Sequence, residues 1–366
     1  MKPTSIFLAS IVIVLGLPTV CSAVSYTITD LGTLGGAVSS GAGISSNGQV
    51  TGQAGSGYDQ HFFPIFRGFL YDGTMHNLGT LGTVSAGIGI NAVGHVTGDT
   101  DIGSGNYRAF LYDGTMHDLG TLSGGTGFNS GGRGINDSGQ ITGYADDGLG
   151  NERAFLYDGT MHDLGTLGGQ DSYGEAINAS GEVTGHARTP GSDHAFLYDG
   201  TMHDLGTLYG DSSVGFAINN HGQVTGAVES AQNVAFLYDS VHGMVDLNSL
   251  INPSLGWRLQ NGRGINNLGQ VIGDGMIGGQ QHAFLYDPVK GVTDLNALLD
   301  PSSPWTLTSA TGINDAGQIT GFGTLNNIGN ATHAFLLTPV PEPSTLVLAA
   351  FGFTALAAWG WRRRKR

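Results

Sequence analysis

Short apolar segments recur along most of this chain, and each ends at a glycine-containing turn. The segments carry Val, Ile, Thr, Phe and Tyr, which favour β-strands. In the Ala-Phe-Leu-Tyr segments, such as 195–198, apolar residues are consecutive, whereas a half-exposed strand would alternate. Residues 26–338 show no helical periodicity. The pattern therefore predicts an all-β body in which some strands are buried on both faces.

These segments belong to an internal repeat of 40 to 51 residues, in which three landmarks each occur seven times. The first is the Phe of the Ala-Phe-Leu-Tyr segment: Phe69, Phe110, Phe155, Phe196, Phe236, Phe284 and Phe335. The second is the Ile of a Gly-x-x-Ile-Asn segment: Ile44, Ile90, Ile135, Ile177, Ile218, Ile265 and Ile313. The third is the Leu of an Asp-Leu pair: Leu31, Leu78, Leu119, Leu164, Leu205, Leu247 and Leu295. Repeats of this length are typical of ring-shaped or stacked architectures.

Each unit divides into four short strands separated by turn residues. The Asn-x-x-Gly step after the first strand, as in Asn136–Gly139, has the chemistry of a type I turn with a left-handed glycine. The Asp-Gly pair after the third strand predicts a two-residue type I′ hairpin turn. In two units, longer loops that end in glycine, 239–243 and 287–291, replace this pair.

A small sheet that is buried on both faces needs a neighbour on each side, as in the ring of a β-propeller, which usually has four to eight blades. The body begins with a lone fourth strand, 26–32, and ends with a third strand, 333–337. The sequence therefore predicts a seven-bladed propeller, closed by pairing of the N-terminal strand with the C-terminal strand, so that no edge is exposed. An open β-solenoid and a two-sheet stack are the alternatives.

The third strand begins with His-Ala-Phe in three units. These tripeptides are His194-Ala195-Phe196, His282-Ala283-Phe284 and His333-Ala334-Phe335. The repeat thereby resembles the extracellular HAF-repeat family over nearly all of residues 26–338. Four units depart at the start of the tripeptide, so the His is not essential to the unit. The resemblance implies an extracellular location and a repeat type, but no reaction.

The N-terminus has the features of a signal peptide. Lys2 precedes an apolar run, 6–17, and the small residues at 21–23 predict cleavage after Ala23. We therefore assign residues 1–23 to a signal peptide and 24–338 to the repeat body. Cys21, the single cysteine, leaves with the signal peptide, so the body has no disulfide and depends on its core.

Residues 339–366 have three parts: the motif Pro341-Glu342-Pro343, an apolar stretch at 346–361, and five basic residues. The apolar stretch predicts one transmembrane helix whose basic end stays cytoplasmic. The three parts resemble the PEP-CTERM sorting signal of Gram-negative bacteria. The resemblance implies that the helix first anchors the protein in the inner membrane. It also implies that an exosortase-type protease recognises Pro341, Glu342 and Pro343, and that the body is released or held at the surface.

Removing both ends makes the body more acidic than the whole chain, whose formal net charge is −15. The body keeps 8 of the 14 Lys and Arg residues against 28 Asp and Glu residues, a net charge near −20. This charge disfavours nucleic acid and anionic lipid as partners, and it tolerates cations or neutral polymers.

The sequence contains no recognisable catalytic constellation or metal-ligand set, and we expect no cofactor. Four of the 12 histidines occupy one repeat position beside a hairpin turn: His76, His117, His162 and His203. Positions repeated around a ring do not converge on one ion, so we expect a structural role for them. His-x-His, HExxH, calcium-loop and nucleophile-elbow motifs are all absent.

The candidate binding residues are Trp257, Arg258 and Trp305, which lie where two units depart from the repeat. Their rings either stack on sugars at one face of the propeller or fill gaps in longer loops. The sequence thus predicts an exported, surface- or matrix-associated, non-catalytic propeller that binds extracellular polysaccharide or a surface protein. The alternative is a propeller-scaffold enzyme that acts on extracellular polysaccharide. Carboxylates or a His/Asp/Tyr cluster converging from different units would favour the enzyme.

Overall fold

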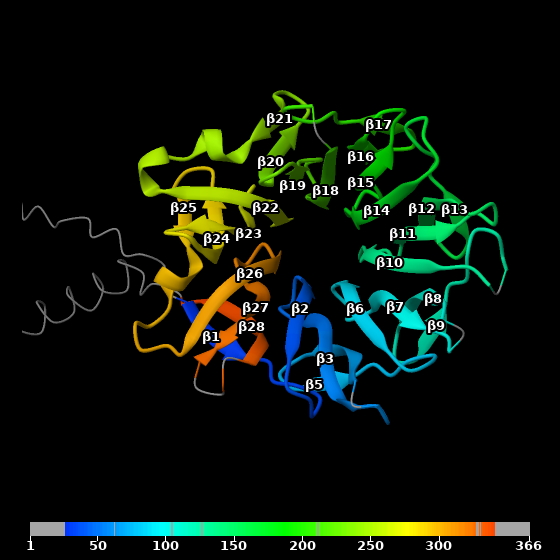
Figure 1. The fold of residues 1–366 in the computed structure, drawn as a ribbon, viewed down its shortest axis with the longest axis horizontal. Helices are drawn as coiled ribbons and strands as arrows, with labels where there is room; N and C mark the ends of the chain where they lie inside the picture. The colour runs from blue at the N-terminus through cyan, green and yellow to red at the C-terminus, as the bar shows by residue number, and fades with distance from the viewer. Residues whose placement is uncertain are drawn as a thin grey trace, which may run out of the picture.

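The computed structural model describes residues 26–340 except 62, 104, 126, 211, 327, 328 and 330. The predicted signal peptide and the residues Pro341, Glu342 and Pro343 lie outside the described residues. The described residues form seven four-stranded antiparallel sheets arranged in a ring (Figure 1). The predicted all-β, seven-bladed propeller is therefore confirmed, and the solenoid and two-sheet alternatives are wrong.

The blades are numbered 1 to 7 along the chain, and the strands of each blade are named from the innermost outward. Blade 1 contains β2 (Ser39–Ile44), β3 (Val50–Tyr58), β4 (Pro64–Tyr71) and β5 (Met75–Asn77). Blade 2 contains β6 (Ser85–Ile90), β7 (Val96–Asp101), β8 (Tyr107–Tyr112) and β9 (Met116–Asp118). Blade 3 contains β10 (Ser130–Ile135), β11 (Ile141–Asp146), β12 (Glu152–Tyr157) and β13 (Met161–Asp163). Blade 4 contains β14 (Ser172–Ile177), β15 (Val183–Arg188), β16 (Asp193–Tyr198) and β17 (Met202–Asp204).

Blade 5 contains β18 (Ser212–Ile218), β19 (Val224–Glu229), β20 (Val234–Asp239) and β21 (Gly243–Asp246). Blade 6 contains β22 (Trp257–Ile265), β23 (Val271–Ile277), β24 (Gln280–Asp287) and β25 (Gly291–Asp294). Blade 7 contains β26 (Trp305–Ile313), β27 (Ile319–Leu325), β28 (Ala331–Pro339) and β1 (Tyr26–Asp30). The connectors after blades 5 and 6 hold the 3-10 segments η1 (Leu247–Leu250), η2 (Pro253–Leu255) and η3 (Leu295–Leu298).

The two ends of the body close the ring. β1 pairs antiparallel with β28, from Tyr26 opposite Pro339 to Asp30 opposite Phe335. In Figure 1 the first strand therefore lies beside the last strands of the chain. The predicted closure is confirmed. Across the described residues, no helix is long and apolar enough to cross a membrane, and the predicted C-terminal helix falls outside them.

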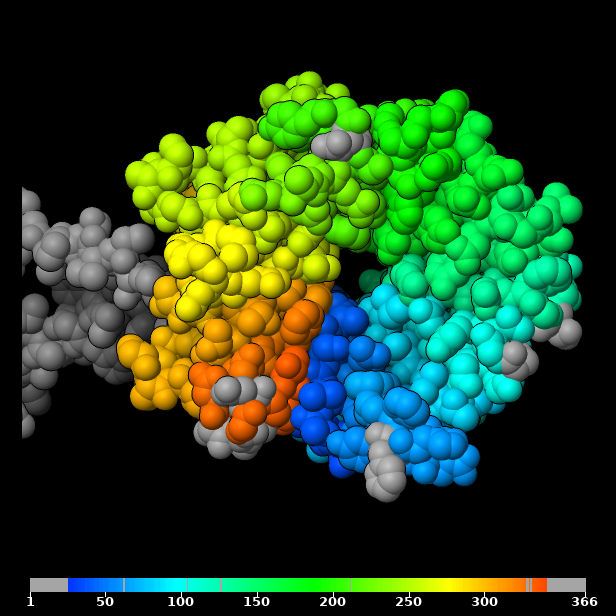
Figure 2. All heavy atoms as spheres, viewed as in Figure 1, coloured from blue at the N-terminus to red at the C-terminus, as the bar shows by residue number. Residues whose placement is uncertain are grey.

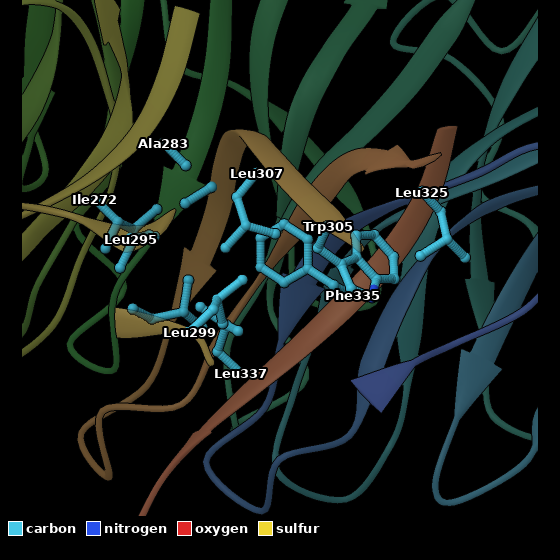
Figure 3. Close-up of a cluster of buried hydrophobic side chains, with 11 residues drawn as sticks. Ile272, Ala283, Leu295, Leu299, Trp305, Leu307, Leu325, Phe335 and Leu337 are labelled. Carbon is cyan, nitrogen blue, oxygen red and sulfur yellow. The ribbon is translucent and has the colours of Figure 1, made fainter. Parts of the chain in front are cut away.

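The repeated Phe of the third strand forms the core between blades, and all seven copies are fully buried. The glycine paired with it on the second strand is required by close packing. A Cβ on Gly143 would lie 1.9 Å from the Gly131 carbonyl oxygen and 3.0 Å from the Phe155 ring. Figure 3 shows a cluster that spans blades 6 and 7, in which Trp305 packs beside Phe335.

The Asn-x-x-Gly turns form as predicted. The Gly139 N–H donates to the Asn136 carbonyl oxygen over 3.0 Å, and Gly139 has a φ of +82°. The Asn136 side-chain oxygen also accepts from the N–H groups of Ser138 and Gln140. These bonds and the positive φ explain why Asn and Gly recur at the first and last positions of this turn.

The predicted type I′ geometry of the Asp-Gly turns is wrong. In blade 1, residues 72–74 form a three-residue loop between the paired residues Tyr71 and Met75, and among them only Gly73 has a positive φ, +119°. The Asp72 carboxylate accepts from the Thr74 N–H and contacts the His76 ring nitrogen at 2.9 Å. These side-chain contacts hold Asp72 out of the left-handed region that type I′ requires.

A ring of asparagine side chains joins the Asn-x-x-Gly turns of neighbouring blades. Each donates its Nδ2 to the carbonyl oxygen of the equivalent residue in the next blade, over 3.0–3.2 Å. The donors are Asn91, Asn136, Asn178, Asn219, Asn266 and Asn314. Blade 1 has Ser45 at this position, and Asn47 instead bonds to Ala92 in blade 2 over 2.7 Å.

Candidate functional site

The inner strands of all seven blades enclose a cavity of about 410 Å³ on the axis, and Figure 2 shows a hollow at the centre of the ring. A second hollow, of about 210 Å³, is lined by the Asn-x-x-Gly turns. Ile44, Ile177, Ile265 and Ile313 line both hollows, so the repeated isoleucines separate them. The larger hollow has the size of a small-molecule site, and we call it the axial cavity.

Each inner strand has a β-bulge at the same repeat position, and β22 and β26 have a second bulge at Gln260 and Thr308. In blade 3 the pairing passes from Gly132 with Gly143 to Gly134 with Thr142, which leaves Arg133 as the extra residue. A bulge redirects its side chain, and the seven residues at the shared bulge position line the axial cavity. They are Ala42, Ile88, Arg133, Glu175, Phe216, Arg263 and Thr311. Six residue types occur at this one position, although the flanking positions repeat.

Charged residues of blades 2, 3 and 4 form an ion cluster at this cavity. Arg133 Nη1 lies 2.7 Å from Asp99 Oδ2, and Arg133 Nε lies 3.8 Å from Glu175 Oε2. On the other side of Glu175, His186 Nδ1 lies 3.9 Å from Oε1. These four side chains are 21–23% exposed, so each is mostly withdrawn from solvent.

Aromatic rings support this cluster from behind. Tyr173 stacks on His186 with 4.7 Å between ring centroids, and Tyr144 lies 5.5 Å from Tyr173. The Arg133 guanidinium lies 5.1 Å from the Tyr144 ring centroid, within cation–π range. Gly131 makes room for this packing, because a Cβ there would lie 2.5 Å from Tyr144 Cε1.

The cluster is incompletely hydrogen-bonded. Among the described residues, Asp99 Oδ1 and His186 Nδ1 are buried without a partner, and no donor hydrogen-bonds to Glu175. Burial raises the pKa of Glu175 and of Asp99, because it disfavours a charged carboxylate, while Arg133 opposes this effect. Burial lowers the pKa of His186, so its ring is neutral near pH 7. Asp99 and His186 are not among the residues that line the cavity, so Glu175, which does line it, is the acceptor of this cluster that a ligand with donors can reach.

The corresponding cluster of blade 6 is saturated. Asp274 is almost fully buried and accepts from Asn261 Nδ2 over 2.7 Å, from Ser309 Oγ over 3.1 Å, and from Arg263 Nε. Arg263 also lies beside Phe216, with 6.0 Å to the ring centroid. This network positions Arg263 at the cavity without leaving an unused acceptor.

The tryptophans predicted as binding residues contribute to packing. Trp305 is 9% exposed and meets Phe335 edge-on at 6.2 Å, and half-buried Trp257 meets Phe284 in the same way. Arg258 Nε is buried without a hydrogen-bond partner in the described part of the chain. This geometry favours the gap-filling interpretation of the two indole rings, and a binding surface at these residues stays a prediction.

The four recurrent histidines lie at the exposed rim, where each pairs with the aspartate of its own hairpin turn. The ring nitrogen lies 2.9–3.0 Å from the carboxylate in the pairs His76–Asp72, His117–Asp113, His162–Asp158 and His203–Asp199. Hydrogen bonds of this kind lower the pKa of each aspartate. The described residues hold no group of three or more His, Cys, Asp or Glu side chains suited to a metal ion.

Comparison with protein families assigns the C-terminus. Residues 339–365 match the PEP-CTERM protein-sorting motif. The chain ends in an exosortase sorting signal. This motif implies export to the surface or exterior of a Gram-negative bacterium and processing by an exosortase. Residues 205–333 match a family described as protein of unknown function DUF3466, so the resemblance to the HAF-repeat family stays a prediction.

Comparison with solved structures finds matches at low identity. TolB from Acinetobacter baumannii is 13% identical, with a TM-score of 0.43, over 61% of this chain and 57% of that one. The β-propeller domain of the Trilobed protease from Pyrococcus furiosus is 13% identical, with a TM-score of 0.35, over 44% and 50%. Pyrococcus horikoshii acylaminoacyl peptidase is 12% identical, with a TM-score of 0.32, over 53% and 31%. The search of curated proteins found no match.

Sequence reasoning missed the bulge residues and the cluster around Arg133. A signal for them is present in the repeat, because the first x of Gly-x-x-Ile differs between units while its neighbours recur. The position after Thr-Gly on the second strand is also variable, and it supplies Asp99, Tyr144 and His186. Both variable positions lie beside the axial cavity or directly behind it.

Proposed function

We propose that this protein is an exported, non-catalytic binding module that holds a unit of an extracellular polysaccharide in its axial cavity. The observation that carries the proposal is the variable bulge position, which places Arg133, Glu175 and Phe216 together on the axis. Phe216 offers an apolar face to a sugar ring, and the charged groups offer hydrogen bonds to its hydroxyls. A surface protein is the other partner class that an exported module of this kind would bind.

We further propose that the protein reaches this setting through its two ends. Residues 1–23 direct export, and the helix within 339–366 holds the chain in the inner membrane until exosortase acts at Pro341, Glu342 and Pro343. Membrane fractionation tests this step. Replacing Pro341 and Pro343 by alanine is expected to retain the protein in the inner-membrane fraction, and unchanged release would contradict it.

A glycan array probed with the purified protein, with calcium and with chelator, tests the binding function. Wild-type protein is expected to bind a limited set of glycans, and Phe216→Ala is expected to weaken that binding about tenfold or more. Arg258→Ala probes the surface predicted from the sequence and is expected to bind as wild type does. Absence of any glycan binding would remove the polysaccharide proposal.

The second candidate function is hydrolysis of an extracellular polysaccharide. It is favoured by the convergence of Asp99, Glu175 and His186 from two blades, since a carboxyl group with a raised pKa suits a general acid. Release of reducing ends from a polysaccharide, lost in Glu175→Gln, would support the enzyme. Binding without any release of reducing ends would support the binding module.

A further inference from the structure

The charges around the axial cavity do not balance. The positive charge of Arg263 is balanced by Asp274, and that of Arg133 is balanced by Asp99, because each guanidinium donates a hydrogen bond to its aspartate. Among the described residues that line the cavity, Glu175 is the remaining charged side chain, and Arg133 Nε lies 3.8 Å from it. One guanidinium therefore serves two carboxylates, and the cavity carries one uncompensated negative charge when Glu175 is ionised.

This balance disfavours an acidic ligand. A ligand carboxylate would approach two arginines that are already occupied by buried aspartates, and it would meet Glu175. The body as a whole, with a net charge near −20, repels it further. Acidic sugars are therefore the poorest match among carbohydrates.

The same residues are a poor site for a divalent metal. A bound calcium ion needs six to eight oxygen ligands, whereas Glu175 is the single carboxylate of the described residues that lines the cavity. Asp99 is held by Arg133, and Asp274 is saturated by its own donors. A cation that needs one carboxylate and brings its own N–H donors fits better.

Resting on the function proposed above, we propose that the axial cavity selects a ligand that bears a protonated amine, such as an amino sugar with a free amino group. The ammonium group pairs with Glu175 and supplies the donors that this carboxylate lacks. Neutral His186, at 3.9 Å, does not compete as a cation. Phe216, the neighbouring bulge residue, contacts the apolar face of the sugar ring.

Calorimetric titration with three trisaccharides tests this choice. The probes are the glucosamine trimer, its fully N-acetylated form and the galacturonic acid trimer. The amine trimer is expected to bind wild-type protein about tenfold or more tightly than the acetylated trimer, because a hydrogen bond to a charged group is stronger than one between neutral groups. The acidic trimer is expected to bind weakest, and added salt is expected to reduce the preference for the amine.

Glu175→Gln is expected to remove most of the preference for the amine trimer and to change the affinity for the acetylated trimer less than threefold. Glu182→Gln is the matched control. This carboxylate lies at the Asn-x-x-Gly turn of the same blade, where five other blades have Gln, and it is expected to leave all three affinities unchanged. Equal binding of the amine and acetylated trimers by wild-type protein, or an unchanged preference in Glu175→Gln, would overturn the inference. If wild-type protein binds none of the three, the inference is overturned, and the glycan array described above decides the polysaccharide function separately.

Discussion

Two reciprocal substitutions test whether the asparagine ring holds the blades together. Asn219 is 4% exposed, and its side chain makes four hydrogen bonds. Its Nδ2 donates to the Asn266 carbonyl oxygen over 3.0 Å and to Gln223 Oε1 over 2.8 Å, and its Oδ1 accepts from the N–H groups of His221 and Gln223. Asn219→Ser breaks this ring, and Ser45→Asn completes it at the position where it is interrupted.

The magnitude follows from the bonds that serine can keep. Ser45 Oγ accepts from the Gln49 N–H over 3.1 Å, so a serine at position 219 keeps the equivalent bond and loses three others. At roughly 0.5–1.5 kcal/mol each, with one buried carbonyl left without its donor, Asn219→Ser costs about 2–4 kcal/mol. Ser45→Asn adds one hydrogen bond between blades 1 and 2, which contributes about 1 kcal/mol. Asn47 already bonds across the same interface, so this new bond is an addition to an existing contact.

Thermal unfolding followed by circular dichroism measures both effects. An unfolding entropy of roughly 2 cal/mol/K per residue, over roughly 300 residues, makes 1 kcal/mol worth about 1.5 °C. Asn219→Ser is therefore expected to lower the Tm by about 3–6 °C, and Ser45→Asn to raise it by about 1–2 °C. A fall of less than about 1 °C in Asn219→Ser, or a fall in Ser45→Asn, would refute the reasoning.

Three further predictions concern packing, closure and pH. Gly143→Ala is expected to cost about 3 kcal/mol or more in thermal unfolding, because its Cβ would lie 1.9 Å from a carbonyl oxygen, whereas Gly127→Ala, with no atom within 4 Å, is expected to change little. Deleting β1 (Tyr26–Asp30) leaves β28 as an open edge, so size-exclusion chromatography is expected to show aggregates. An elution profile unchanged from that of the wild-type protein would contradict the closure argument. Burial raises the pKa of Glu175 in the folded state, so its favourable contribution to folding stability is present below its ordinary pKa and is lost as the pH rises through the raised value. The Tm of Glu175→Gln minus the Tm of the wild-type protein is therefore expected to grow from pH 4 to pH 7.5. A difference that stays constant with pH would contradict the burial effect.

Much of the fold could be predicted from the sequence, because each landmark residue has one strong structural cause. The repeated Phe marks the core position between blades, and the Gly of Asn-x-x-Gly marks a positive φ. The split hairpin at the two ends predicts the closure. The Asp-Gly turn departs from its predicted type, because the contacts of Asp72 with Thr74 and His76 outweigh the local preference for a type I′ turn.

The axial site could not be predicted in the same way, because alternation along a strand does not reveal a bulge. The extra residue shifts the strand pairing by one position. Because side chains normally alternate between the two faces of a sheet, the position of Arg133 relative to Ile135 in the sequence does not show which way its side chain is directed. The usable signal is variation within a strict repeat. Rim positions such as that of His117 recur in separate blades and stay far apart, whereas bulge residues from all seven blades meet on the axis. Differences between Arg133, Glu175 and Phe216 therefore break the sevenfold symmetry at the one place where a single ligand can contact several blades at once.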